Sequence, residues 1–145
     1  MKITLCGSIN FAKDMIRIKE QLEEKGHEAL LPPSLEKFSI KNTEDAERLK
    51  SDRKRYINEI KPVYTKEHFK NVAGSDAILV INKEKYGIEN YIGGATFAEI
   101  MLAFHYDKKI FFLNHIPKDE KFSFLIDELE SIKPIILNGD LDLIK

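Results

Sequence analysis

The sequence has one cysteine, no tryptophan and no long hydrophobic run. A single cysteine, Cys6, excludes an internal disulfide framework and favours a reducing compartment, so we expect the protein to be cytoplasmic. No apolar run approaches the length of a membrane-spanning helix, so no membrane partner is expected. The residues before Gly7 are too few for a signal peptide and indicate a first strand instead.

An excess of charge of either sign is also missing. Among the 145 residues, 23 lysines and arginines nearly balance 24 aspartates and glutamates, which leaves a formal net charge of -1. No global basic field is therefore available to attract a nucleic acid polymer. The length and the 43% hydrophobic content predict one domain over residues 1–145, large enough to bury a core.

Several local motifs for catalysis and metal binding are absent. The sequence contains no G-x-S-x-G elbow, no Walker loop and no G-x-G-x-x-G fingerprint. Cys6 ends an apolar run, which favours a packing role over a nucleophilic one. The four scattered histidines, which share no zinc-type spacing, are His27, His68, His105 and His115. We therefore expect no metal and no other cofactor.

What the sequence does contain is an alternation of apolar runs and helical periodicities. The predicted strands are residues 2–6, 28–31, 77–81, 110–113 and 135–137. The predicted helices run from residue 11 to a stop at Gly26, over 44–60, over 65–73, from Gly94 to about 106, and over 122–132, while 34–42 is a predicted loop. This alternation predicts an α/β, Rossmann-like or flavodoxin-like three-layer fold with a five-stranded parallel sheet. Ligands in such folds bind at the carboxyl ends of the strands.

A charged helical insertion is predicted at about residues 43–61, with Thr43 as its cap and Pro62 at its end. The next helix is predicted to be capped by Thr65. The basic residues of the insertion are Arg48, Lys50, Arg53, Lys54 and Arg55. A solvated helix face is the more common explanation of such a run. The functional alternative is a lid whose cations approach a substrate phosphate.

Residues 91–104 stand out because Glu99 is their only charged side chain. Gly93 and Gly94 precede an apolar helix, and Glu99 lies in its second turn. A lone carboxylate is costly to bury unless another group holds it, and Thr96, one turn earlier, can orient it. Taken alone, such an acid more commonly favours the helix dipole or makes a structural hydrogen bond.

The turn after the first strand offers a possible anion site. Backbone N–H groups from Gly7 to Asn10 can hold an anion, and the Ser8 hydroxyl adds a donor, although the same turn also fits a simple N-cap. A carboxylate facing such a turn across a crevice suits attack on a sugar carbon of a substrate that carries a phosphate or a base. The leaving group needs a proton donor, and His68 is the first candidate, with a surface or capping histidine as the alternative.

Four segments resemble one enzyme superfamily. Residues 5–9 (LCGSI) resemble the first-strand motif of 2′-deoxynucleoside 5′-phosphate N-hydrolases. Residues 95–100 (ATFAEI) resemble the Gly-Thr-x-x-Glu-Ile/Leu-Gly segment of nucleoside 2-deoxyribosyltransferases. Residues 75–80 and 109–113 are similar to two further strand regions of that family. The resemblance implies that Glu99 is the nucleophile that takes the deoxyribosyl group.

The sequence departs from the family pattern at defined positions. His68 stands where the family has an aspartate, and Gly93 stands where an acid that helps to recognise the base is expected. Ala95 and Met101 replace glycines, and Ile3 replaces a tyrosine of the first strand. These changes leave the nucleophile and the anion-binding turn in place.

We therefore predict an N-glycosidase or deoxyribosyl transferase that cleaves the N-glycosidic bond of a (deoxy)nucleoside or nucleoside 5′-monophosphate. The predicted catalytic residues are Glu99 and His68, and the predicted substrate-binding residues are Gly7, Ser8, Ile9, Asn10, Tyr91, Gly93, Gly94 and Thr96. Hydrolysis is preferred to transfer because the Gly-Ser turn suits a phosphate and the base-binding acid is missing. Tyr91 either stacks on the base or simply packs.

Two further expectations concern alternatives and partners. The alternative function is a non-catalytic nucleotide-binding module of the same fold, which the loss of the family's aspartate favours. The Glu99 helix is apolar nearly all the way round, and one side of it needs a cover that the sheet cannot supply. A homodimer with its sites near the interface is therefore predicted.

Overall fold

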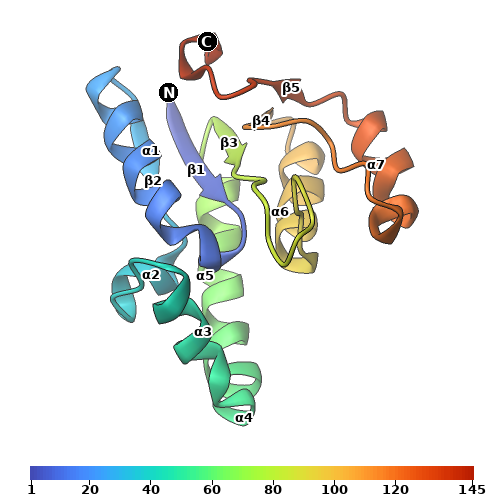
Figure 1. Ribbon diagram of the computed structural model, residues 1–145. Helices are drawn as coiled ribbons and strands as arrows, with labels where there is room; N and C mark the ends of the chain where they lie inside the picture. The colour runs from blue at the N-terminus through green and yellow to red at the C-terminus, as the bar shows by residue number, and fades with distance from the viewer.

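A five-stranded sheet forms the centre of the computed structural model, which describes residues 1–145 (Figure 1). The strands are β1 (Lys2–Cys6), β2 (Glu28–Leu30), β3 (Ala77–Val80), β4 (Lys109–Phe112) and β5 (Ile135–Ile136). Their order is β2-β1-β3-β4-β5, and every neighbouring pair is parallel. The predicted α/β class and the five-stranded parallel sheet are confirmed. This order is that of flavodoxin-like folds, in which the direction of winding reverses between β1 and β3.

Helices cover both faces of the sheet. The α-helices of the chain are α1 (Ala12–Glu24), α2 (Pro33–Lys37), α3 (Thr43–Ser51), α4 (Arg53–Arg55), α5 (Lys61–Ala73), α6 (Gly94–His105) and α7 (Ile126–Ser131). One buried cluster joins α1 to Ile3 and Leu5 of β1, and a second joins α5, α6 and α7 to the other face. Cys6 belongs to the second cluster, because side chains alternate between the faces of a strand. The end of β1 therefore points Cys6 toward α5 and α6.

The strand predictions hold to within one residue at each end, and α6 begins and ends where the sequence places it. Residues 122–132 are helical, but as a 3₁₀ segment, Glu120–Leu125, followed by the short α7. No helix has both the length and the apolar character required to cross a bilayer.

The loop predicted over residues 34–42 is wrong in its first half, which forms α2. Pro33 occupies the first turn of this helix, where its missing N–H costs nothing. Leu35 is buried and anchors the helix in the core beside α1. Tertiary burial thus stabilises a helix too short to be recognised from its periodicity.

The single helix predicted over residues 44–60 is also wrong, because the segment is divided. Asn42, rather than Thr43, caps α3: its side-chain oxygen accepts a hydrogen bond from the N–H of Asp45 at 2.9 Å. The helix ends at Ser51, since Asp52 leaves helical geometry and caps α4 by accepting from the N–H of Arg55. The segments α2, α3 and α4 gather beyond the carboxyl end of β1 (Figure 1).

Pro62 does not end a helix as predicted. It lies in the first turn of α5, which follows α4 through one π-helical turn, Tyr56–Ile60. Proline is tolerated in a first turn because the N–H that it lacks has no partner there in a regular α-helix. Thr65 is therefore not a cap but an interior residue of α5. This continuous helical path carries the segment before Pro62 to the same side of the molecule as His68.

Candidate active site

A cavity of about 300 Å³ opens beyond the carboxyl ends of the strands, where the order of the sheet reverses. Its walls come from the turn after β1, the segment after β2, the α3–α5 region, the loop after β3 and the start of α6. Segments that are distant in sequence thus share one site of a size suited to a small molecule.

All but one of the predicted site residues line this cavity. They are Gly7, Ser8, Ile9, His68, Tyr91, Gly93, Gly94, Thr96 and Glu99. Gly7 is required by packing, because a Cβ atom there would lie 2.8 Å from the Ile81 carbonyl oxygen. The glycine brings the backbone of the turn close to the end of β3, and the turn forms one edge of the cavity.

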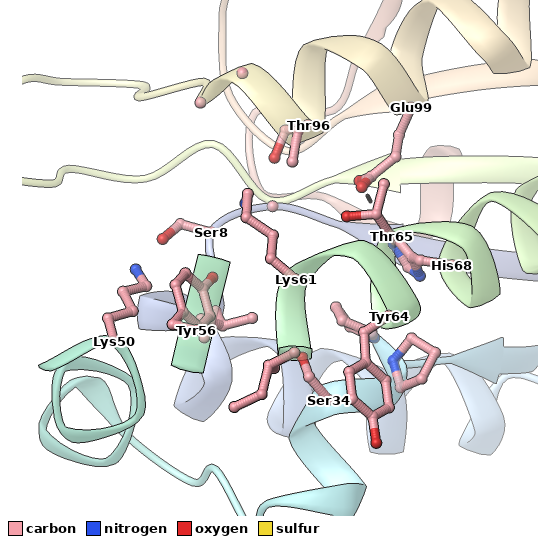
Figure 2. Close-up of a pocket in the computed structure, with 18 of the residues that line it drawn as sticks. Ser8, Ser34, Lys50, Tyr56, Lys61, Tyr64, Thr65, His68, Thr96 and Glu99 are labelled. Atoms are coloured by element: carbon pink, nitrogen blue, oxygen red, sulfur yellow. Dashed lines mark ion pairs between the residues drawn. The ribbon is translucent and has the colours of Figure 1, made fainter. Parts of the chain in front are cut away.

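The inner end of the cavity holds Glu99 of α6 opposite His68 of α5 (Figure 2). His68 Nε2 lies 3.4 Å from Glu99 Oε1, and the two side chains are only 6% and 7% exposed. Neither ring nitrogen of His68 has a hydrogen-bond partner within the protein. The pair is close enough to attract when the imidazole is protonated, yet longer than a strong hydrogen bond.

Thr96 does not hold the Glu99 carboxylate as predicted. The structure has no hydrogen bond between the two side chains, although Thr96 is buried and lines the same cavity one turn earlier on α6. The groups that approach Glu99 instead are His68 and Cys6. Both come from other elements, so the helical spacing of α6 could not reveal them.

Cys6 lies beside His68 and Glu99 at the inner end but does not line the cavity. Its sulfur, an imidazole nitrogen of His68 and a carboxylate oxygen of Glu99 all lie within 4.8 Å of one another. Burial raises the pKa of the Cys6 thiol well above its usual value, and the nearby charge of Glu99 raises it further. A neutral buried thiol is a poor nucleophile, in keeping with the packing role predicted for Cys6.

The outer end of the cavity carries cations. Lys85 Nζ donates to the Ser8 hydroxyl oxygen at 2.8 Å, and Lys50 Nζ donates to the Asn10 side-chain oxygen at 2.6 Å. Burial, followed by the charge of Lys85, lowers the pKa of Lys50 to about 8. Burial also lowers the pKa of Lys85. Two crowded ammonium groups of this kind would be stabilised by an anion.

Asn10 is the predicted substrate-binding residue that does not line the cavity. It is buried behind the wall, where its amide nitrogen donates to Glu47 at 2.7 Å and its amide oxygen accepts from Lys50. The Asn10 carbonyl accepts a hydrogen bond from the Thr43 hydroxyl at 2.9 Å. Asn10 therefore positions Lys50 and ties α3 to the turn after β1, and it does not face the cavity itself.

The basic residues of the stretch 48–55 do not all fit one of the two interpretations, a solvated helix face or a lid over a phosphate. Lys50 and Arg53 line the cavity, as a lid would require. Arg48 and Lys54 are exposed and do not line it, and Arg55 lies over the Phe38 ring at 5.7 Å. The solvated-face interpretation therefore holds for part of the stretch and is wrong for Lys50, which is half-buried.

Several lining residues were missed in the sequence. Lys61, Tyr64 and Thr65 line the cavity and recur, with the predicted His68, at helical spacing along α5 (Figure 2). Because the sequence predicts that a helix ends at Pro62, it did not reveal that Lys61 and Tyr64 belong to the same helix as His68. Other missed lining residues are Pro32, Pro33, Ser34, Tyr56, Ile57, Ile60 and Lys85.

Tyr91 is half-buried and held on two sides. Its ring meets that of Phe122 edge to face at 5.5 Å, and Lys85 Nζ lies 4.8 Å from its centroid. The ring therefore packs within the protein and also lines the cavity, so packing and contact with a ligand are compatible roles.

The sequence matches no protein-family model, and no curated protein matches it significantly. A functional assignment must therefore be argued from the chemistry of the cavity.

Proposed function

We propose that this protein is an N-glycosidase of the nucleoside 2-deoxyribosyltransferase type, acting on a (deoxy)nucleoside 5′-monophosphate through Glu99. The observation that carries the proposal is a buried carboxylate beside a histidine at one end of a cavity whose other end holds lysines. A substrate with a reactive sugar carbon and a phosphate matches both ends. The motif resemblance around Gly7 and Glu99 supports the same chemistry.

In the proposed reaction, a Glu99 oxygen attacks the anomeric carbon of the sugar. The bond from that carbon to the base breaks, its electron pair leaves with the base, and the base takes up one proton. Water then attacks the glycosyl ester at the same carbon, releases the carboxylate and loses its own proton. The net change is hydrolysis of one glycosidic bond, with Glu99 regenerated.

His68 is proposed to serve this reaction in two ways. As an imidazolium 3.4 Å from Glu99, it would stabilise the carboxylate in its buried position. It would also pass a proton to the departing base and accept one from the attacking water. An imidazole without a protein hydrogen-bond partner is free to make such contacts with a substrate.

The substrate's phosphate is proposed to bind at the outer end. Ser8 and Lys85 already form one hydrogen-bonded pair there, and Lys50 is held beside them by Asn10. A phosphate would accept charge-assisted hydrogen bonds from both ammonium groups, and its negative charge would offset the repulsion between them. Gly93 stands where the resembling family has an acid that helps to recognise the base. The absence of this acid favours water, rather than a second base, as the acceptor of the sugar.

The test compares release of free base from the four common deoxynucleoside 5′-monophosphates by the wild type and by Glu99→Ala. The wild type should release base from at least one nucleotide, and Glu99→Ala should be slower by more than about 1000-fold, because the nucleophile is gone. Glu89→Ala, at an exposed position in the loop before α6, is the matched control and should behave as the wild type.

Intact mass spectrometry of the same mixtures should detect a transient sugar-phosphate adduct on the wild type alone. Unchanged nucleotide in both samples, together with measurable nucleotide binding, would instead support the non-catalytic binding module. The observation that favours this second function is that His68 stands where the resembling family has an aspartate.

We also propose a homodimer formed through α6. Phe104 is 45% exposed near the end of that helix, and Phe97, Met101 and Leu102 are half-buried. Solution scattering at micromolar concentration should give the mass of two chains, and Phe104→Glu should reduce it to one. A wild type that remains strictly monomeric would contradict the proposal.

A further inference from the structure

The inner end of the cavity joins three metal-ligating side chains from three separate elements. Cys6 comes from β1, His68 from α5 and Glu99 from α6. As whole residues they are 0%, 5% and 5% exposed, and their ligand atoms all lie within 4.8 Å of one another. A thiol, an imidazole and a carboxylate are the three kinds of side chain that bind zinc.

The distance between His68 and Glu99 fits a shared ion better than a direct bond. A charge-assisted N–H···O hydrogen bond is about 2.7–2.9 Å long, whereas the observed separation is 3.4 Å. Two ligand atoms each about 2.0–2.1 Å from a zinc ion, at a tetrahedral angle, lie about 3.3 Å apart. Little movement of either side chain is needed for both to reach one ion.

The His68 ring supplies an independent observation. It is buried, and neither of its nitrogens is hydrogen-bonded to a protein group. Buried polar atoms almost always have partners, and a bound ion is one of the few explanations for an exception. The ring faces Glu99 inside the cavity, so its lone pair is directed at a site already furnished with a carboxylate.

We propose that Cys6, His68 and Glu99 bind one zinc-type divalent cation, whose fourth coordination position faces the cavity. His68 and Glu99 line the cavity while Cys6 lies behind them, so a water or a ligand can reach only one side of the ion. The sulfur ligand selects borderline and soft cations such as Zn²⁺ or Co²⁺ over Mg²⁺ or Ca²⁺.

The charges of this site balance. On binding, the Cys6 sulfhydryl bond breaks, its proton goes to solvent, and the sulfur forms a bond to the ion. One thiolate and one carboxylate then neutralise the two positive charges, and the imidazole binds as the neutral form. A neutral cluster is compatible with the burial of all three side chains.

Metal binding and the proposed glycosidase reaction exclude each other. An ion that is bound to the Glu99 carboxylate withdraws electron density from both of its oxygens and occupies the space beside them that the anomeric carbon must enter. Zinc should therefore inhibit base release, and the assays of that activity should contain a chelator. Binding itself is measured without turnover, so its failure and the failure of the proposed function can be distinguished.

The first measurement titrates tag-free, chelator-treated protein with Zn²⁺ against a chromophoric chelator, and then with Co²⁺ by absorption. We expect one ion per chain, a thiolate-to-cobalt charge-transfer band and the intense visible bands of tetrahedral Co²⁺. Cys6 is the single cysteine of the chain, so a thiolate band identifies it directly. Excess Mg²⁺ or Ca²⁺ should not displace the ion.

Three variants test the assignment of the ligands. Cys6→Ser should abolish the charge-transfer band, and His68→Gln and Glu99→Gln should each weaken Zn²⁺ binding by at least about 100-fold, because loss of a direct ligand exceeds the 10–100-fold effect of its supporting contacts. His105→Gln, which removes an exposed histidine from the same helix as Glu99, is the control and should bind as the wild type.

Circular dichroism of each variant shows whether it is folded. The Co²⁺ absorption spectrum of the wild type tests the proposal without any substitution. Co²⁺ that binds without a thiolate band would overturn it. Binding of less than one ion per chain, or an affinity that the three variants leave unchanged, would overturn it as well.

Discussion

The two ends of the cavity differ in their surroundings and in how their residues are held. The inner end consists of Cys6, His68 and Glu99, which are almost completely buried and come from β1, α5 and α6. The outer end consists of half-buried or exposed cations, Lys50 and Lys85 among them, on α3 and on the loop after β3. Solvent has little access to the inner end, whereas the outer end remains in contact with it.

Under the proposed function, this difference gives the two ends distinct tasks. In a dry environment, each charge interacts strongly with its neighbours, so the inner end suits the making and breaking of bonds. At the wetter outer end, charges are screened and serve to attract and orient a ligand. Substitutions at the inner end should therefore change turnover, and substitutions at the outer end should change affinity.

After Glu99→Ala, the largest expected effect is that of His68→Ala on turnover. Loss of a general acid–base group costs about 100- to 10,000-fold in rate, so base release should fall by that factor. The dissociation constant of the nucleotide should change little, because the outer end is intact. Single-turnover kinetics and calorimetry on the same protein separate the two quantities. A weaker affinity with unchanged turnover would remove the distinction between the ends.

A smaller effect is expected from Lys85→Met. A hydrogen bond to a charged group contributes about 1.5–3 kcal/mol, so the KM for a nucleoside monophosphate should rise by roughly 10- to 100-fold. The unphosphorylated nucleoside should be unaffected, since it lacks the group that Lys85 is proposed to bind. Lys54→Met, at an exposed cation outside the cavity, is the control. Equal losses for nucleoside and nucleotide would contradict a phosphate site here.

The smallest effect concerns pH. Because the pKa of Lys50 in the free protein is about 8, nucleotide affinity should decline as pH rises through that value and the ammonium loses its proton. Lys50→Met should bind more weakly and lose this part of the pH dependence. Isothermal titration calorimetry between pH 7 and about 10 measures both curves. A wild-type affinity that stays constant over this range would rule Lys50 out of the phosphate contact.

The stability of the free protein should change in the opposite direction. The pKa of Lys50 lies below its unfolded value of 10.5, so the unfolded chain binds more protons between about pH 8 and 10.5. The contribution of Lys50 to the free energy of unfolding therefore increases as pH rises through that window. Denaturant unfolding of the wild type and Lys50→Met measures the difference.

The inner end was partly predictable because apolar context marks its residues. Glu99 is conspicuous as the only charge in residues 91–104, and the alternation of strands and helices places it at the carboxyl edge of the sheet. Its neighbours were less accessible. Cys6 and His68 reach Glu99 through the packing of three elements, and no spacing in the sequence encodes that meeting.

The outer end was harder to predict because its contacts are long-range and polar. Lys85 meets Ser8 across the fold, and Lys50 meets Asn10, and neither pair forms a motif. The positions of helix ends near the outer end were also ambiguous in the sequence. Asn42 and Thr43 are both good caps, and only the position of the Asp45 N–H decides between them. Pro62 is compatible with either the end or the beginning of a helix, and the structure shows the latter.

The π-helical turn at Tyr56–Ile60 has a consequence for how the site can evolve. Such a turn contains one residue more than an α-helical turn does. Loss of a single codon within it would give an ordinary turn, and because the extra residue is contained in the wider turn, the segments on either side would keep nearly the same rotation about the helix axis. Lys50 and Arg53 would therefore still face the cavity that His68 lines. One residue of this turn can thus be lost or gained in evolution without separating the two ends of the cavity.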